Sequence, residues 1–286
     1  MSFASFIWEF IDLGIGFANQ AVSRLFPFRR INARPDIAWD VIGVASTVVF
    51  VYFAETLLEV PSDWLWSFAA VDNWSATVGA WPWWVSGPLY LVLADLGGYW
   101  AHRLLHTRGL WPTHAWHHSP KYLYWASGLR GSPVHTVVLL APYAVVYVFF
   151  PIPDVEAVAV AIAIIDIGNQ HFIHSNILVP FHRQVERVFI TPRFHFVHHS
   201  TIRSFTDSNY GFIFSWWDRL FGTYTDPDKV AVDDPLGLNY ENSNVRLLLG
   251  LPPGPSPQPS PASGRGSGPS PQPSPASGRG SRDLSA

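Results

Sequence analysis

The sequence predicts an all-α integral-membrane protein, a bundle of about four spans with a histidine-rich helical cap on the cytoplasmic side. Three observations support this fold class: a low charge content, four long apolar stretches, and tight groups of histidines near the ends of those stretches. Charged residues make up 14% of the 286 residues, whereas roughly 25% is usual in soluble globular proteins. Helices that face lipid carry few charges, so this deficit indicates a membrane protein.

Charge and cysteine content exclude other classes. The net charge of −3 provides no basic field, so we do not expect nucleic acid as a partner. The chain has no cysteine, which rules out disulfides, iron–sulfur clusters and zinc held by thiolates.

The first 34 residues are expected to form an amphipathic helix in the membrane interface. Apolar residues such as Phe6, Phe10 and Phe17 recur at helical spacing with polar residues between them. The segment lacks the basic start, apolar run and small-residue cleavage site of a secretory signal. The alternative is a buried helix that packs on the rest of the protein.

Four apolar stretches are each close to the roughly 20 residues that a bilayer requires. They are residues 39–60, 85–105, 134–152 and 155–174. Lysine and arginine occur before the first stretch and after the second and fourth, whereas residues 61–84 contain none. By the positive-inside rule, both termini and all the histidine groups then lie on the cytoplasmic side. We expect a multi-pass protein of a bacterial inner membrane.

The composition changes sharply after residue 250. The 14-residue segment 254–267, rich in Pro, Ser and Gly, is repeated identically at 268–281. Such a segment cannot bury enough apolar surface to offset its ordering entropy. The expected organisation is an interfacial helix over 1–34, a membrane-embedded domain over 35–250 and a disordered tail over 251–286.

Ten of the twelve histidines occur in four groups, and imidazole is a common ligand for zinc, copper, iron and nickel. The groups are His102 and His106; His114, His117 and His118; His171 and His174; and His195, His198 and His199. One zinc ion uses three or four protein ligands, so this number of imidazoles predicts two ions. His171 is kept as a candidate ligand, with a hydrogen-bonding or an interfacial role as the alternatives. His135 and His182 stand alone and are not expected to be ligands, although His135 could line the site.

Helical periodicity places carboxylates beside two of the groups. His102 and His106 share one face of a helix, and Asp95 falls on the same face about two turns earlier. We expect Asp95 to accept a hydrogen bond from a ligating histidine, the alternative being a bond to a neighbouring helix. Asp166 shares a stripe with His174 in the fourth span and is a second candidate for this role.

Several motifs between Leu93 and Tyr224 share the pattern of one family. They are DLGGYWAHRLLH from Asp95, WPTHAWHHSP from Trp111, HSN from His174, TPRFHFVHHS from Thr191, NYG from Asn209 and WDRLFGT from Trp217. In these motifs, over about half of its length, the chain resembles the fatty acid hydroxylase/sterol desaturase superfamily of integral-membrane di-iron oxygenases. Carried over residue by residue, the resemblance implies metal ligands at His102, His106, His114, His117, His118, His174, His195, His198 and His199. His171 matches no general position of the family.

The resemblance implies an O2-dependent oxidoreductase with two iron ions, although imidazole sites also accept zinc. Such an enzyme hydroxylates or desaturates a C–H bond of a membrane lipid, for example a fatty acyl chain or a sterol-like ring. No haem or flavin motif is visible, so electrons would come from a separate donor protein. Two positions depart from the family pattern: Phe196 stands where a basic residue is common, and His135 replaces the Glu of a frequent Pro-x-Glu motif.

Two other functions remain open at this point. A membrane metal transporter or metal-binding protein would also need many imidazoles, but here they gather on one face and form no path across the membrane. A metal-dependent hydrolase usually mixes carboxylates with histidines to position water, and carboxylates are scarce among these groups.

Overall fold

The regular structure of the chain is helical. The computed structural model describes residues 3–30, 33–152, 156–202, 204–231 and 234–254, and within these ranges there are isolated β-bridges but no named strand. The all-α prediction is therefore confirmed for the described residues. The expected disordered tail lies outside the described residues from position 255 onward.

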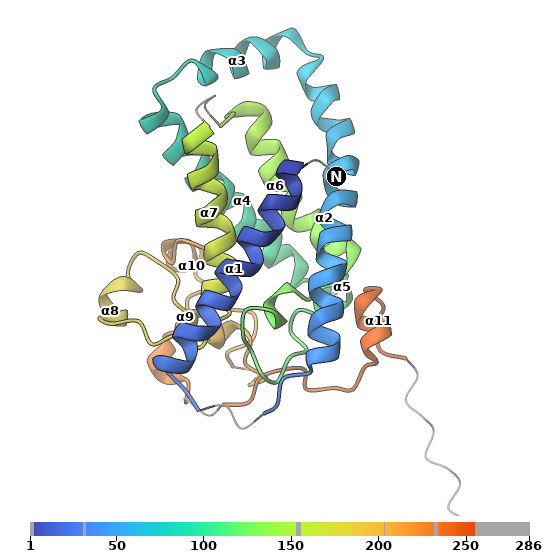
Figure 1. The fold of residues 1–286 in the computed structure, drawn as a ribbon, viewed down its shortest axis with the longest axis vertical. Helices are drawn as coiled ribbons and strands as arrows, with labels where there is room; N and C mark the ends of the chain where they lie inside the picture. The colour runs from blue at the N-terminus through green and yellow to red at the C-terminus, as the bar shows by residue number, and fades with distance from the viewer. Residues whose placement is uncertain (1–2, 31–32, 153–155, 203, 232–233, 255–286) are drawn as a thin grey trace, which may run out of the picture. The chain divides into compact units, whose positions relative to one another are not determined.

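The long helices run alongside one another, and most of the short ones lie toward one end of them (Figure 1). The long helices are α1 (Phe3–Leu25), α2 (Ile37–Trp66), α4 (Trp83–Leu105), α6 (Pro133–Phe149) and α7 (Glu156–Ile173). The shorter ones are α3 (Ala69–Gly79), α5 (Trp111–His114), α8 (His182–Val185), α9 (Pro192–His198), α10 (Trp216–Leu220) and α11 (Asn244–Leu248). Single 3-10 turns occupy Ser127–Leu129 and Pro227–Lys229.

Helix α6 packs against both α2 and α4. Its approach to α4 is close because Gly97 faces Pro142: a Cβ atom added at Gly97 would lie 2.5 Å from the Pro142 Cβ atom. A larger residue at position 97 would therefore push the two helices apart. Since α4 carries His102 and leads into His106, this close contact also sets where the first histidine group lies.

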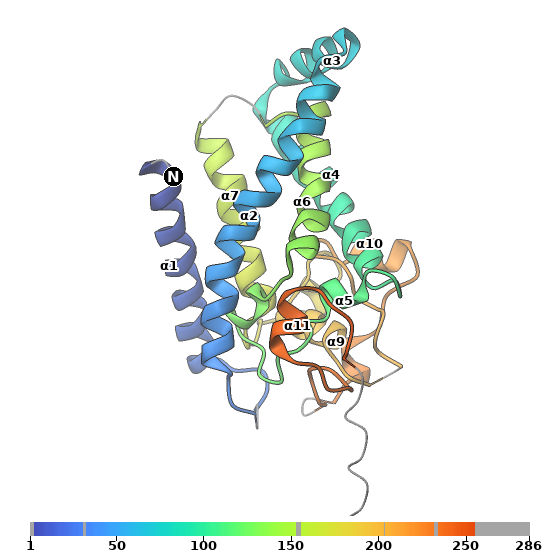
Figure 2. The ribbon, with the colours of Figure 1, turned by 90° about the vertical axis from the view of Figure 1, so that its right-hand side faces the viewer.

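Helix α1 packs against α7, as Figures 1 and 2 show. It approaches closely at Gly16, where an added Cβ would lie 2.4 Å from the Trp125 ring. Asp12 of α1 also pairs with His171 of α7 at 2.6 Å. Other apolar side chains of the helix, such as Phe17 and Leu25, remain exposed. The structure thus shows α1 packed on α7, and its place in a membrane interface stays a prediction.

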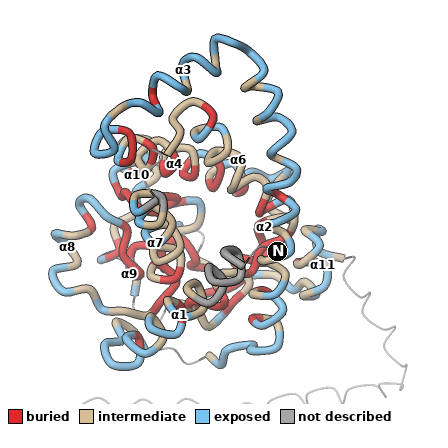
Figure 3. The backbone as a smooth tube through the Cα atoms, turned by 45° about the horizontal axis from the view of Figure 1, so that its top comes forward, coloured by how far each residue is buried: buried red, intermediate tan, exposed pale blue. Residues whose placement is uncertain are grey.

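One helix among the described residues, α2, is long and apolar enough to cross a membrane. Only 11% of its most apolar window is buried inside the protein, and its exposed residues include Val49, Phe53 and Leu57. In Figure 3 much of α2 and α3 is exposed, whereas buried positions gather toward α9. Helix α6 and residues Val160–Ile173 of α7 are apolar but shorter. Exposed apolar surface of this extent is typical of contact with a membrane or a partner.

Part of the apolar core is built from the sequence neighbours of the histidines. Ile173 and Phe194 pack together beside His174 and His195. Trp116, which lies between His114 and His117, is fully buried near α11. Because a buried side chain fixes the backbone that carries it, this packing positions the adjacent imidazoles.

Candidate metal centre

Nine histidines form two groups in which the ligand nitrogens lie within 4.8 Å of one another. Group 1 contains His102, His106, His114, His118 and His198. Group 2 contains His117, His174, His195 and His199. These nine are the positions that the family resemblance implies as ligands, and the structure brings all of them together.

Short helices and turns distribute the side chains between the groups. His117 and His118 follow each other in the turn after α5, so they point to different groups. His195 and His199, one helical turn apart, share group 2, whereas His198 joins group 1.

Helix α9, which carries His195 and His198 and ends just before His199, has a capped N-terminus. Thr191 accepts a hydrogen bond from the Phe194 backbone N–H, and Pro192 occupies the first turn, as is typical of helix N-termini. The Thr191 hydroxyl in turn donates to Glu186. The start of the helix, and with it the direction of its histidines, is therefore fixed by local contacts.

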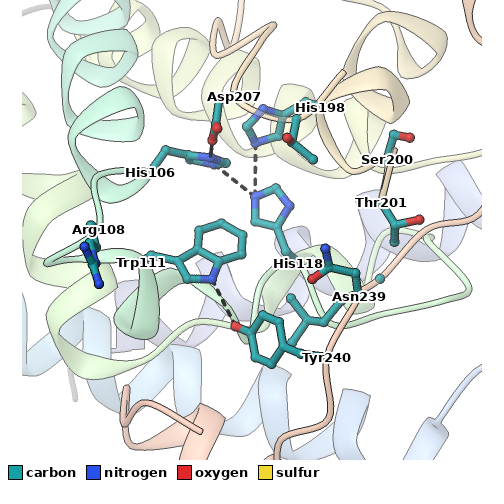
Figure 4. A pocket seen from close by; sticks show the side chains of 13 residues that line it. His106, Arg108, Trp111, His118, His198, Ser200, Thr201, Asp207, Asn239 and Tyr240 are labelled. Atoms are coloured by element: carbon teal, nitrogen blue, oxygen red, sulfur yellow. Dashed lines mark hydrogen bonds and ion pairs between the residues drawn. The ribbon is translucent and has the colours of Figure 1, made fainter. Parts of the chain in front are cut away.

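In group 1 the imidazole nitrogens converge on one point. The His118 Nε2 atom lies 3.2 Å from His106 Nε2 and 3.1 Å from the Nε2 atoms of both His114 and His198. Figure 4 shows His106, His118 and His198 directed toward one another from three segments of the chain. A single imidazole nitrogen carries either one proton or one lone pair, so it cannot satisfy three neighbours at once.

Group 2 has the same geometry. The His174 Nε2 atom lies 3.2 Å from His117 Nε2 and 3.1 Å from His195 Nε2, and the His199 and His195 Nε2 atoms are 3.1 Å apart. Two nitrogens bound at about 2.1 Å to one ion, at right angles to each other, would lie about 3.0 Å apart. The spacing in both groups therefore fits nitrogen atoms arranged around a cation.

The other ring nitrogen is held by an acceptor in several of these histidines. His102 Nδ1 donates to the Tyr210 carbonyl oxygen, His198 Nδ1 to that of Ser208, and His174 Nδ1 to that of Gln170, at 2.7–2.8 Å. A proton on Nδ1 leaves a lone pair on Nε2, which is the atom that faces the group. Lone pairs that face one another repel unless a cation lies between them, so the donor set fits bound metal. The His102 Nε2 atom is in addition buried without a protein partner.

The electrostatics of the site favour neutral imidazole. Outside the long helices, burial lowers the pKa values of six of these histidines well below their usual range, and nearby histidines contribute to the shift in the same direction. The six are His114, His117, His118, His195, His198 and His199. Neutral imidazole is the form that binds a metal ion, so these residues need not lose a proton to do so.

Neither of the two carboxylates expected to orient a histidine accepts a hydrogen bond from one among the described residues. Asp95 accepts hydrogen bonds from the backbone N–H groups of Ile213 and Phe214 and from the Trp217 indole at 2.8–3.0 Å, and no described histidine donates to it. It therefore anchors residues 213–217 to α4. Asp166 accepts from the Tyr143 hydroxyl at 3.1 Å. The alternative given for Asp95, a hydrogen bond to a neighbouring helix, holds for Trp217 of α10, whereas the two backbone donors precede that helix.

The three histidines outside the two groups lie in different surroundings. His171 belongs to neither group, because its Nε2 atom pairs with Asp12 of α1. His182 starts the short helix α8 and also lies outside both groups. His135, by contrast, is buried against the site: its Nδ1 atom is 2.7 Å from His114 Nδ1. Its position is fixed because it follows the N-cap Ser132 and Pro133 at the start of α6.

Sequence reasoning missed Asp207. Its carboxylate lies 3.2 Å from His106 Nδ1 and so performs the orienting role that was expected of Asp95. Asp207 has a φ of 62°, a left-handed conformation that Asp tolerates better than most residues. It stands in an irregular segment about 100 positions from His106, so no periodicity in the sequence could have linked the two.

Two cavities reach the histidines from different sides. A polar pocket of about 490 Å³ is lined by His106, His118 and His198 together with residues such as Arg108, Asp207 and Tyr240 (Figure 4). A second space of about 180 Å³ lies between α2, α6 and α7 and is lined by four other histidines. Three of them, His102, His114 and His117, come from the two groups, and the fourth is His135. The apolar part of its wall comprises Val51, Leu129, Leu139, Leu140 and Phe212.

Comparison with known proteins relates the chain to lipid-modifying enzymes. The family model described as fatty acid hydroxylase matches residues 87–223. An alkylglycerol monooxygenase from Danio rerio is 33% identical over 59% of this chain and 36% of its own length. An ornithine lipid hydroxylase from Rhizobium tropici is 31% identical over 54% of this chain and 46% of its own. A Delta(7)-sterol 5(6)-desaturase from Aspergillus fumigatus is 29% identical over 54% of this chain and 53% of its own.

All ten histidines predicted as ligands lie within residues 87–223, so the matched region includes every histidine of both groups. The chain spans only about a third to a half of the length of these curated relatives. No solved structure matches the chain.

Proposed function

The chain belongs to the fatty acid hydroxylase/sterol desaturase superfamily, and from this premise we propose that it is an O2-dependent oxidoreductase that hydroxylates or desaturates a C–H bond of a membrane lipid. The observation that carries the proposal is the pair of histidine groups, with nitrogens spaced for cations, inside the region that matches the family. The relatives' names include both hydroxylases and a desaturase, which supports the two outcomes.

Each histidine group would hold one ion, and the nitrogen-only donor set suits iron. Group 1 would use His102, His106, His114, His118 and His198, and group 2 would use His117, His174, His195 and His199. His171 is not part of this proposal because it pairs with Asp12. When bound, iron supplies the activation of O2 and the oxidation of an unreactive C–H bond.

The protein's own residues hold and orient the imidazoles and exclude water. Backbone carbonyls and the Asp207 carboxylate fix which ring nitrogen faces the group for three histidines of group 1 and for His174 of group 2. Trp116 and Phe194 are fully buried next to the histidines and would help to exclude water from them. The apolar space against His102, His114 and His117 would receive the hydrocarbon part of the substrate beside both groups.

The setting in the cell is also proposed. We place the histidines at the cytoplasmic ends of about four spans that include α2, α4, α6 and α7, with α1 as an interfacial helix and residues 35–250 as the membrane-embedded domain. The exposed apolar side chains of α2 support membrane contact. Electrons would come from a separate donor protein, because the chain carries no motif for a redox cofactor besides the histidines.

Comparative lipidomics tests the proposal. Membranes of a host that expresses the protein should contain a lipid with one added oxygen atom or two fewer hydrogen atoms, and the product should disappear without O2. The His118→Ala variant should make none, whereas His182→Ala, outside both groups, should match the parent. Metal uptake without a lipid product would favour a transporter, and O2-independent turnover would favour a hydrolase.

A further inference from the structure

Tyr143 and Asp166 form a partition between two cavities. The histidine-lined cavity, of about 180 Å³, and a second cavity, of about 190 Å³, both have Tyr143 of α6 and Asp166 of α7 in their walls. The Tyr143 hydroxyl donates to Asp166 Oδ1 at 3.1 Å, which ties the two helices together at this point. Apart from these two side chains, the residues around the cavities differ.

The second cavity suits hydrocarbon. It lies between α4, α6 and α7, and most of its wall is aliphatic. The apolar part of the wall comprises Leu91, Ala94, Ile152, Ile162, Ala163 and Ile213. Its other carboxylate, Asp95, already accepts three hydrogen bonds from residues 213–217. A polar headgroup would therefore find few free hydrogen-bonding partners in this cavity, whereas the methyl end of a hydrocarbon chain needs none.

Cavity size points in the same direction. Pockets that bury a ligand are usually about 300–1,000 Å³. Neither cavity reaches this range alone, but joined they would. The partition thus decides whether the space beside the histidines is a short pocket or a longer channel.

We propose that Tyr143 and Asp166 set the length of the aliphatic chain that the protein accepts, by ending the histidine-lined cavity and closing off the second one. The aliphatic chain of the substrate lies with its reacting part against His102, His114 and His117 and its distal part against the Tyr143–Asp166 pair. Removal of the Tyr143 ring joins the cavities and admits longer chains. The inference rests on the proposed function for the identity of the substrate as a lipid.

The test separates binding from turnover. Purified protein is incubated with an equimolar, graded series of saturated fatty acids in detergent, and the bound chains are identified by mass spectrometry; turnover of the same series is measured in parallel. We expect Tyr143→Ala to raise the ratio of longer to shorter bound chains by roughly tenfold, the low end of the effect of one methylene group in a hydrophobic pocket. Tyr143→Phe, which keeps the ring but loses the hydrogen bond, should shift the ratio less and in the same direction.

Two further variants make the result specific. Tyr147→Ala is the matched control, because Tyr147 lies one turn further along α6, is exposed and lines neither cavity. Adding Ala163→Leu to Tyr143→Ala refills the second cavity and should return the ratio toward that of the parent.

An unchanged length profile in a folded Tyr143→Ala variant would overturn the proposal, as would equal weakening for all lengths or a parent that binds none of the acids. If the parent binds chains but oxidises no lipid, the proposed function fails while the length profile still tests the partition.

Discussion

His106 lies between Asp207 and His118: its Nδ1 atom is 3.2 Å from the Asp207 carboxylate and its Nε2 atom is 3.2 Å from His118 Nε2. A carboxylate on one ring nitrogen directs the proton there and leaves the other nitrogen free to bind metal. His102 and His198 achieve the same result with backbone carbonyls. Among these three residues, His106 alone depends on a side chain that can be replaced.

Asp207→Asn should therefore weaken metal binding in group 1. Loss of such a partner commonly costs about 10–100-fold in metal affinity or activity. Metal titration of the metal-free protein should show a weakened affinity for one ion and an unchanged affinity for the other, because His106 belongs to group 1 only. The control is Asp72→Asn on exposed α3, and equal weakening of both ions would contradict the assignment.

Asp95→Ala should destabilise the fold rather than alter the metal ligands directly. It would leave the backbone N–H groups of Ile213 and Phe214 and the Trp217 indole without their acceptor. Each unsatisfied buried group costs about 1–3 kcal/mol, so we expect a loss of at least about 3 kcal/mol. Thermal unfolding in detergent measures the effect, with the exposed Asp63→Ala as the control. A melting temperature equal to that of the parent would show that this anchor is unimportant.

His135→Glu should keep more activity than His135→Ala. One of the two Nδ1 atoms in the His114–His135 contact must carry the proton, and a carboxylate at position 135 could still accept a hydrogen bond from the His114 Nδ1–H group. The resemblance to the family also predicts Glu as a compatible residue here. Lipid product formed per bound metal is the measurement. A His135→Glu variant no better than His135→Ala would argue that the site needs the imidazole itself.

Deletion of residues 255–286 should leave lipid oxidation and metal content unchanged. The two histidine groups lie within residues 102–199 and the cavities that they line within residues 47–240, and the repeats carry no candidate ligand. The comparison is product formation at equal protein level. An inactive truncation with a normal melting temperature would give the tail a role that its composition does not indicate.

Local sequence spacing predicted much of the site. The i, i+4 pair His102 and His106 and the pair His195 and His199 each lie on one helix face, and the structure places each pair in one group. Adjacent residues such as His117 and His118 point to different groups, which follows from the turn after α5 and not from the spacing itself.

Long-range contacts account for what the sequence did not reveal. The spacing placed Asp95 beside His102, but the backbone N–H groups of Ile213 and Phe214 and the Trp217 indole donate hydrogen bonds to its carboxylate instead. His171 lies next to the polar stripe of α7 that contains Asp166 and His174, so the sequence made it a ligand candidate. In the structure its Nε2 atom pairs instead with Asp12 of α1. Partners so far apart in the chain depend on how the helices pack, which residue periodicity does not encode.

The most direct test of the central claim is the number of metal ions per chain in purified protein, measured by elemental analysis for the parent and for one variant in each histidine group. We predict two ions, predominantly iron, in the parent and about one in both His198→Ala and His199→Ala, with product formation lost in each. A parent that holds a single ion, or variants that keep the full metal content, would contradict it.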